Sequence, residues 1–343
     1  MVDRKLEAVE QRMLQLAIAI SVQDRDREGR AHLDLGNAYL SLPDYQEAIK
    51  NYTEALHISI ERGCRAEEGL ACGNLGSGYF CLGNCIQAIE YHEKHLSIAK
   101  EVGDTAGEGA ACVNLGNVYS RLGNCKQAIK YLENSLSIAK EVGNRAGEGL
   151  AYRSLGIVYR KLGNFKEAIE YHEKHLSIAK AVGDRAGEGS AYGHLGNGYL
   201  GLGNFKEAIG YYEKQLSIAK EVGDRAGEGS ACGSLGIGYF RLGNLIQAIE
   251  YHEKHISIAK EVGDRHEEGS GCGNLGIAYF CLGNFIQAIE YHEKHLSIAR
   301  EVGDRAGEGA ACGNLGNAYD SLGNFKQAIK YHKDSLSIAK ESR

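Results

Sequence analysis

Residues 111–128 read ACVNLGNVYSRLGNCKQA, and the spacing of the leucine, glycine, tyrosine and alanine in this stretch decides the fold. Leu115-Gly116 is followed three residues later by Tyr119, and Ala128 comes nine residues after this tyrosine. The same pattern recurs every 40 residues, eight times and without an insertion or a deletion, from Leu35-Gly36 to Leu315-Gly316. A fixed period of this length is typical of a protein built by stacking one supersecondary unit.

Each unit predicts two helices, as the third one illustrates. Asp104 is a suitable N-cap for a first helix, and Gly123 supplies the left-handed residue that ends it. Asn124 is the N-cap of a second helix, with Gln127 at the spacing of a capping box. A helical period places Ala106, Cys112, Leu115, Tyr119 and Leu122 on the apolar side of the first helix. In the second helix the apolar side carries Ala128, Ile129, Leu136, Ala139 and Val142.

Links of about two residues make neighbouring helices antiparallel. The fold class is therefore predicted to be all-α, a solenoid of antiparallel helix pairs. Residues 1–24 match the second helix of a leading repeat whose first helix is missing, because Glu7-Ala8-Val9-Glu10 lies 40 residues before Glu47-Ala48-Ile49-Lys50. Residues 25–343 are predicted to form eight 40-residue units in one continuous solenoid. We expect the chain to be a piece of a longer protein, with a terminal helix that can stack end-to-end on another chain.

Composition excludes several classes of protein. A net charge of −6 argues against a nucleic-acid-binding protein. The apolar segment Leu14 to Ile20 is too short to cross a bilayer, so no membrane insertion is expected. Half of the 10 cysteines share one repeat position, which favours a small buried side chain over a disulfide framework. A reducing, cytoplasmic setting follows from that cysteine usage.

Side chains that could carry chemistry recur with the repeat and have simpler structural explanations. Histidines at i, i+3 could hold a metal, but no third ligand repeats with them, so a structural role is favoured. These pairs are His92/His95, His172/His175, His252/His255 and His292/His295. Cys81 and Cys85 are interpreted as two free thiols, with a redox pair as the alternative. Glycine strings such as Gly187-Glu188-Gly189 lack the lysine and the strand of a phosphate loop. No metal, no cofactor and no enzyme activity are predicted, because eight equivalent active sites are not credible.

The pattern Leu-Gly-x-x-Tyr followed by alanine resembles the tetratricopeptide repeat (TPR). The 40-residue unit, with Leu-Gly-Asn, Tyr-His-Glu-Lys-His-Leu and Val-Gly-Asp-Arg, is similar to the Partner-of-Inscuteable (Pins/LGN) subclass, the G-protein-signalling modulators. This resemblance covers residues 7–343 and implies a right-handed superhelix whose first helices line a concave groove. Members of that subclass also carry GoLoco segments that hold Gα·GDP, and this sequence contains none.

Groove positions taken from the resemblance predict a peptide-binding face. They are residues 30, 33, 34, 37, 40 and 41 of the first unit and their equivalents. The candidate amides are Asn37, Asn74, Asn114, Asn117, Asn197, Asn274, Asn314 and Asn317; the candidate cations are Arg30, Arg121, Arg153, Arg160, Lys161 and Arg241; the candidate rings are Phe80, Phe240 and Phe280.

Amides suit an extended peptide backbone because they both donate and accept hydrogen bonds. The six cations outnumber the two anions at these positions, Asp34 and Asp320, so the predicted partner is an acidic peptide. The predicted function is a protein–protein interaction scaffold or adaptor. The alternative is a structural array, or the sensor region of a larger signalling protein, with no dedicated peptide ligand.

Overall fold

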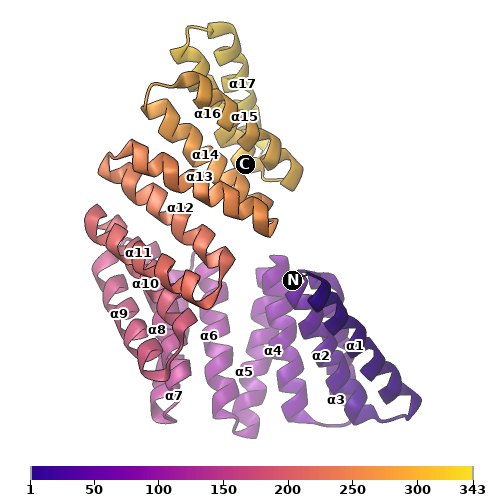
Figure 1. The fold of residues 1–343 in the computed structure, drawn as a ribbon. Coiled ribbons are helices and arrows are strands. Elements are labelled where there is room, and N and C mark those ends of the chain that lie inside the picture. Colours follow the sequence, from indigo (N-terminus) through magenta and orange to yellow (C-terminus); the bar gives the residue numbers. More distant parts are fainter. Residues whose placement is uncertain (1, 342–343) are drawn as a thin grey trace. The chain divides into compact units, whose positions relative to one another are not determined.

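A computed structural model describes residues 2–341, and these residues form 17 α-helices joined by links of two or three residues. Contacts divide the chain into two compact units, Met1–Asn164 and Phe165–Arg343. Within both of them, each helix runs antiparallel to the next and packs mainly on its neighbours in sequence (Figure 1). The prediction of an all-α solenoid of antiparallel helix pairs is confirmed.

Helix boundaries follow the 40-residue period. The first unit contains α1 (Val2–Ser21), α2 (Arg25–Ser41), α3 (Tyr45–Glu61), α4 (Arg65–Leu82), α5 (Cys85–Val102), α6 (Thr105–Arg121), α7 (Cys125–Glu141) and α8 (Arg145–Lys161). The second unit contains α9 (Phe165–Val182), α10 (Arg185–Gly201), α11 (Phe205–Val222), α12 (Arg225–Leu242), α13 (Leu245–Val262), α14 (Arg265–Cys281), α15 (Phe285–Val302), α16 (Arg305–Ser321) and α17 (Phe325–Glu341).

The helix ends are set by the residues that the sequence indicated. Oδ1 of Asp104 accepts a hydrogen bond from the backbone N–H of Gly107 at 2.9 Å, and Oδ1 of Asn124 accepts one from Gln127 at 3.2 Å. These bonds satisfy N–H groups that the first turn of a helix leaves without a partner. Gly123 has φ +79°, which a glycine adopts without a Cβ clash. The predicted caps of the third repeat are therefore confirmed.

Within each unit, the core lies between the paired helices of the repeats. The repeated leucine of the first helix, such as Leu115, is 0–4% exposed. The repeated alanine in the first turn of the second helix, such as Ala128, is 0–3% exposed. The recurrent cysteines Cys72, Cys112, Cys232, Cys272 and Cys312 are buried and free, as predicted. Ala106, Leu122 and Val142 are exposed, so their assignment to the apolar faces was wrong. These residues lie at the helix ends, beyond the contact with the paired helix.

A ladder of ion pairs joins the start of the first helix to the end of the second helix in six of the eight repeats. In the sixth repeat, Arg225 contacts Glu228 at 2.9 Å and Glu261 at 2.7 Å, so one guanidinium ties α12 to α13. Hydrogen bonding to Arg225 lowers the pKa of the Glu261 carboxyl. The recurrent glutamate of the first helix, here Glu228, is thus bound by an arginine three residues before it. The same arrangement recurs at Arg25, Arg65, Arg185, Arg265 and Arg305.

The third repeat lacks the arginine of this ladder, because Thr105 takes its place while Glu108 and Glu141 are retained. Replacing Thr105 with Arg is expected to restore the contacts and raise the free energy of unfolding by up to about 1 kcal/mol, the upper range for exposed pairs. Urea unfolding at low and at high salt measures this gain. Thr105→Gln is the control without charge. An equal gain for both variants, or one that high salt leaves intact, contradicts the ion-pair explanation.

Candidate functional site

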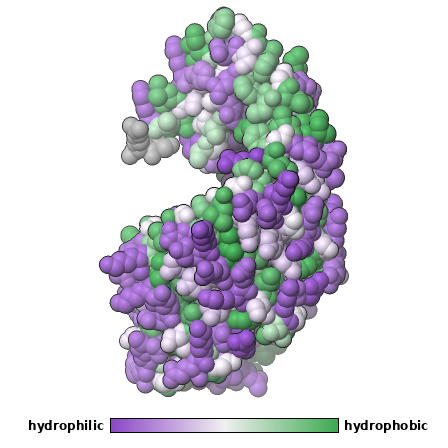
Figure 2. All heavy atoms as spheres, turned by 90° about the vertical axis from the view of Figure 1, so that its left-hand side faces the viewer, coloured by the Kyte–Doolittle hydropathy of each residue, from purple (hydrophilic) through white to green (hydrophobic). Residues whose placement is uncertain are grey.

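All the residues predicted to bind a peptide lie on first helices of the repeats, from Arg30 on α2 to Asn317 on α16. Within the first unit α2, α4, α6 and α8 contact one another in succession, and within the second unit α10, α12, α14 and α16 do the same. Each unit therefore brings its own predicted residues onto one series of adjacent helices. Figure 2 shows that hydrophilic and hydrophobic residues are interspersed in small groups over the face of the molecule in view.

Two of the predicted amides have a structural task. Oδ1 of Asn37 accepts a hydrogen bond from the buried Tyr52 hydroxyl at 2.7 Å, and Oδ1 of Asn197 accepts one from Tyr212 at 2.8 Å. Tyr52 and Tyr212 occupy the position at which most repeats have histidine or leucine. The amide NH₂ groups of these asparagines are left for other contacts. Asn114, Asn274 and Asn314 line hollows on the first helices.

Four of the predicted cations make contacts within the chain, and those of Arg30 belong to a network described below. Arg121 donates to the carbonyl oxygen of Phe80 at 2.8 Å and lies over its ring at 5.0 Å. Lys161 donates to the carbonyl oxygen of Ser120 at 3.1 Å. Both cations lie at the C-terminus of the preceding first helix, where free carbonyl groups and the helix dipole favour positive charge. Arg241 lies over the Phe205 ring at 5.7 Å.

The rings predicted to receive apolar side chains are partly occupied as well. The guanidinium of Arg121 covers Phe80, and Phe240 packs on a core cluster around Leu275. Phe280 packs on Phe285 with their ring centroids 5.4 Å apart. These contacts leave less of each ring for a ligand than the sequence suggested.

Arg153 and Arg160 differ from the other cations. Nε of each side chain is buried and has no hydrogen-bond partner, and the described residues place no carboxylate within 4.0 Å of either guanidinium. They lie seven positions apart on α8, so both side chains lie on the same side of the helix about 10 Å apart along its axis. A buried guanidinium nitrogen without a partner has a strong tendency to bind an anion or a carbonyl oxygen.

Hollows recur on the first helices at one place in the repeat. Each lies between a first helix, the end of the second helix and the start of the next first helix. Their volumes are about 250 Å³ at α6–α8, 320 Å³ at α10–α12, 200 Å³ at α12–α14 and 310 Å³ at α14–α16. Glycines open this space, since Gly109, Gly189, Gly229 and Gly269 each line one hollow without a side chain.

The α6–α8 hollow differs in chemistry from those of the second unit. Val113, Ile138, Val142 and Leu150 make its lining mainly apolar. The three hollows of the second unit carry carboxylates, contributed by Asp224, Asp264, Glu267 and Asp304, and no lysine or arginine lines them.

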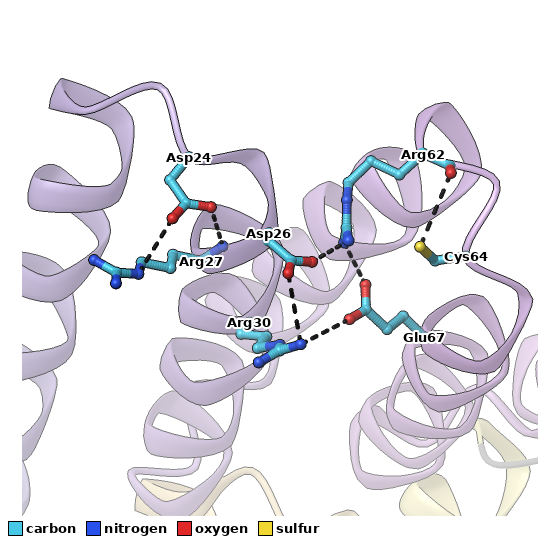
Figure 3. A network of polar contacts seen from close by, with 7 residues as sticks. All are labelled: Asp24, Asp26, Arg27, Arg30, Arg62, Cys64 and Glu67. Atoms are coloured by element: carbon cyan, nitrogen blue, oxygen red, sulfur yellow. Dashed lines mark hydrogen bonds and ion pairs between the residues drawn. The ribbon is translucent and has the colours of Figure 1, made fainter.

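An ion-pair network occupies the equivalent place in the first repeat (Figure 3). The guanidinium of Arg62 lies between the carboxylates of Asp26 and Glu67, with 2.5 Å between its Nη1 and the Glu67 oxygen. Arg30, one of the predicted groove cations, lies 3.7 Å from Asp26 and 3.6 Å from Glu67. Ala106, Val142 and Gly147, which line the α6–α8 hollow, are the repeat equivalents of residues 26, 62 and 67. In the first repeat, charged side chains therefore stand where the third repeat has the lining of a hollow.

The histidine pairs are packed inside the repeats. His92, His252 and His292 are each 1% exposed, and burial lowers the pKa of each imidazole to about 4. The ring of His252 lies against Gly236, where an added Cβ would come within 2.5 Å of it. Among residues 2–341, no group of three or more histidine, cysteine or acidic side chains is arranged to hold a metal. Cys81 and Cys85 are free thiols.

The helices of the described region are all too short or too polar to span a membrane. The sequence pattern of the tetratricopeptide repeat matches residues 109–181, 187–268 and 272–341. Two further patterns of the same description match residues 15–61 and 71–106. No curated protein matches the sequence.

Several solved structures share the fold. One is a signal transduction ATPase with numerous domains (STAND) and a tetratricopeptide repeat sensor, from Pyrococcus horikoshii, with a TM-score of 0.72 and 19% identity. The match covers 98% of this chain and 54% of that protein, so this chain spans about half of its length.

Two other similar structures match along nearly their whole length. The apo form of the quorum sensor NprR from B. thuringiensis has a TM-score of 0.66 and 15% identity, and the match covers 97% of this chain and 99% of that one. A Rap protein complexed with competence and sporulation factor has a TM-score of 0.61 and 16% identity, and the match covers 98% of both chains.

Proposed function

The chain belongs to the tetratricopeptide repeat family, and from this premise we propose that it is a binding scaffold, not an enzyme, that holds an extended acidic peptide along its first helices. The observation that carries the acidic character of the ligand is the pair Arg153 and Arg160, whose Nε atoms are buried without a partner. Both side chains are only half-buried, and each guanidinium carries further N–H donors that can form charge-assisted hydrogen bonds with a carboxylate of a ligand.

The asparagines support the peptide part of the proposal. Asn114 on α6 lines a hollow beside α8, and a neighbouring amide on the same helix, Asn117, is half-buried. Side-chain amides there can pair with the N–H and C=O groups of an extended chain, which otherwise remain bonded to water. A Rap protein with a similar fold holds competence and sporulation factor in its solved structure, which supports a ligand-binding role for this chain.

Two finer assignments belong to the same proposal. The 40-residue sequence pattern of the repeat supports membership of the Pins/LGN-like subclass. The free thiols support a reducing, cytoplasmic setting. We further propose that α17 mediates end-to-end self-association, because Phe325 is 63%, Ile329 56% and Leu336 55% exposed. Dilution in analytical ultracentrifugation tests it.

Reversing the charge at Arg153 and Arg160 is expected to weaken binding of an acidic peptide by at least about tenfold, because it removes two charge-assisted contacts. The probe is a fluorescein-labelled peptide of five Gly-Ser-Glu units, and fluorescence anisotropy measures its Kd for the wild type and for Arg153→Glu/Arg160→Glu. A probe of five Gly-Ser-Gln units reports binding without carboxylates.

The matched control is Lys126→Glu/Lys130→Glu, which changes the net charge equally at two exposed lysines of α7. Circular dichroism checks that both variants keep the helical fold. Equal weakening by the two double variants assigns the effect to overall charge and contradicts the proposed site. Unchanged affinity after reversal at Arg153 and Arg160 favours the alternative, an array without a dedicated acidic ligand.

A further inference from the structure

The first repeat shows how the place of a hollow accommodates an arginine. Arg62 belongs to the link after α3, and its guanidinium reaches Asp26 of α2 and Glu67 of α4 (Figure 3). Its side chain is 24% exposed and that of Glu67 25%, so the pair is shielded from much of the solvent. Three elements therefore form a site whose carboxylates hold a guanidinium from this chain.

The α12–α14 hollow keeps one of the two carboxylates and lacks both the arginine and the second carboxylate, because Ala226 replaces Asp26. Counting 200 residues onward, Glu267 is the equivalent of Glu67, while Val262 replaces Arg62 and Ser230 replaces Arg30. Asp264 adds a carboxylate where the first repeat has Cys64, and one of its oxygens accepts from the backbone N–H of Glu267 at 3.0 Å. Glu267 also contacts Nε2 of His255 at 3.0 Å.

The lining of the α12–α14 hollow is therefore negatively charged. Asp264 and Glu267 line it, and no lysine or arginine does. The Glu267 side chain is 52% exposed, so a ligand can reach it, and the hollow beside it measures about 200 Å³. A planar guanidinium presents several N–H donors to a carboxylate in a fixed geometry, which an ammonium group does not.

We propose that the α12–α14 hollow binds the guanidinium of an arginine side chain carried by the bound peptide, in the place that Arg62 takes in the first repeat. This inference rests on the proposed peptide-binding function and specifies one side chain of the ligand for the second unit. The carboxylates of Glu267 and Asp264 supply the hydrogen-bond acceptors. The small residues Ser230 and Gly229 leave space for the guanidinium.

The probes are fluorescein-labelled peptides of five Gly-Ser-Arg units and their counterparts with lysine or with citrulline, which keeps the shape of arginine without its charge. Anisotropy on the full chain is expected to give the tightest Kd for arginine. Glu267→Gln is expected to weaken the arginine peptide by about fivefold, in keeping with one partly exposed charged contact. The matched control Glu207→Gln, an exposed carboxylate of α11 outside the hollow, is expected to leave this Kd unchanged.

Transplanting the arginine of the first repeat gives an independent variant. Val262→Arg is expected to fill the α12–α14 hollow and to weaken the arginine peptide at least as much as Glu267→Gln does. If Val262→Arg fails to fold, the substitution at the exposed Glu267 still decides the matter. Equal affinity for the arginine and citrulline peptides overturns the proposal, as does equal weakening by Glu207→Gln. Equal affinity for lysine overturns the assignment to a guanidinium.

The same variants separate this inference from the proposed function. Glu267→Gln is expected to leave binding of the Gly-Ser-Glu probe unchanged, because that probe depends on Arg153 and Arg160 of the first unit. If Glu267→Gln weakens binding of the arginine peptide while the acidic probe does not bind, the acidic-peptide proposal is contradicted and the arginine site is supported. If the acidic probe binds and Glu267→Gln leaves the Kd of the arginine peptide unchanged, only the arginine site is contradicted.

Discussion

Lowering the pH from about 7 to about 5 is expected to cost the folded state about 2 kcal/mol for each of three buried histidines, His92, His252 and His292. Burial lowers the pKa of each from 6.5 to about 4, so each is neutral in the folded chain at both pH values. In the unfolded chain the imidazole takes up a proton below pH 6.5. The unfolded state thus binds more protons in this window, and the stability present above pH 6.5 is lost as the pH falls towards 4.

Urea unfolding at several pH values between 7 and 5 measures this loss. The test variant replaces all three histidines with leucine, which the repeat already accepts at this position because Leu132 is fully buried there. The pH dependence, rather than the stability itself, is the quantity compared. His57→Leu is the control, since the side chain of His57 is 76% exposed. A triple variant that keeps the steep pH dependence of the wild type assigns acid sensitivity to other groups and contradicts the explanation.

The sequence predicted the helices well because their ends depend on local contacts. Asp104 and Asn124 bond to N–H groups three residues away, and Gly123 needs only its own backbone freedom. Burial of the repeated leucine also follows from a local period. The exposure of Leu122 and Val142 did not, because both residues fit the period but lie past the contact with the paired helix.

The candidate site was less predictable because its chemistry depends on which side chains meet. Arg121 was predicted to face a ligand, yet its guanidinium bonds to the carbonyl of Phe80, 41 residues away. The hollows could not be predicted from the sequence, because they form where glycines leave space among three helices. The sequence did contain one indication of this chemistry. Glu67 and Glu267 occupy a repeat position at which five of the other repeats have glycine. Glu67 lies in the ion-pair network of the first repeat, and Glu267 lines the acidic α12–α14 hollow.

Adding one methyl group at Gly236 is expected to lower the free energy of unfolding by about 1–3 kcal/mol, the usual cost of overpacking a core. A Cβ at this position would come within 2.5 Å of Cε1 and 2.6 Å of Nδ1 of His252. The ring cannot easily move away, because His252 is 1% exposed and packs between α12 and α13. The clash therefore outweighs the gain of up to about 1 kcal/mol that alanine brings to a helix.

Gly210→Ala in α11 is the matched control, since nothing lies within 4 Å of an added Cβ there. The same chemical change is expected to raise the free energy of unfolding by about 0.5–1 kcal/mol at this site, because only the helix-propensity term remains. Urea unfolding of both variants compares the two signs. A Gly236→Ala/His252→Ala double variant tests the cause, because removing the ring removes the clash and the two effects then fail to add. Additive losses in that double-mutant cycle contradict the proposed contact.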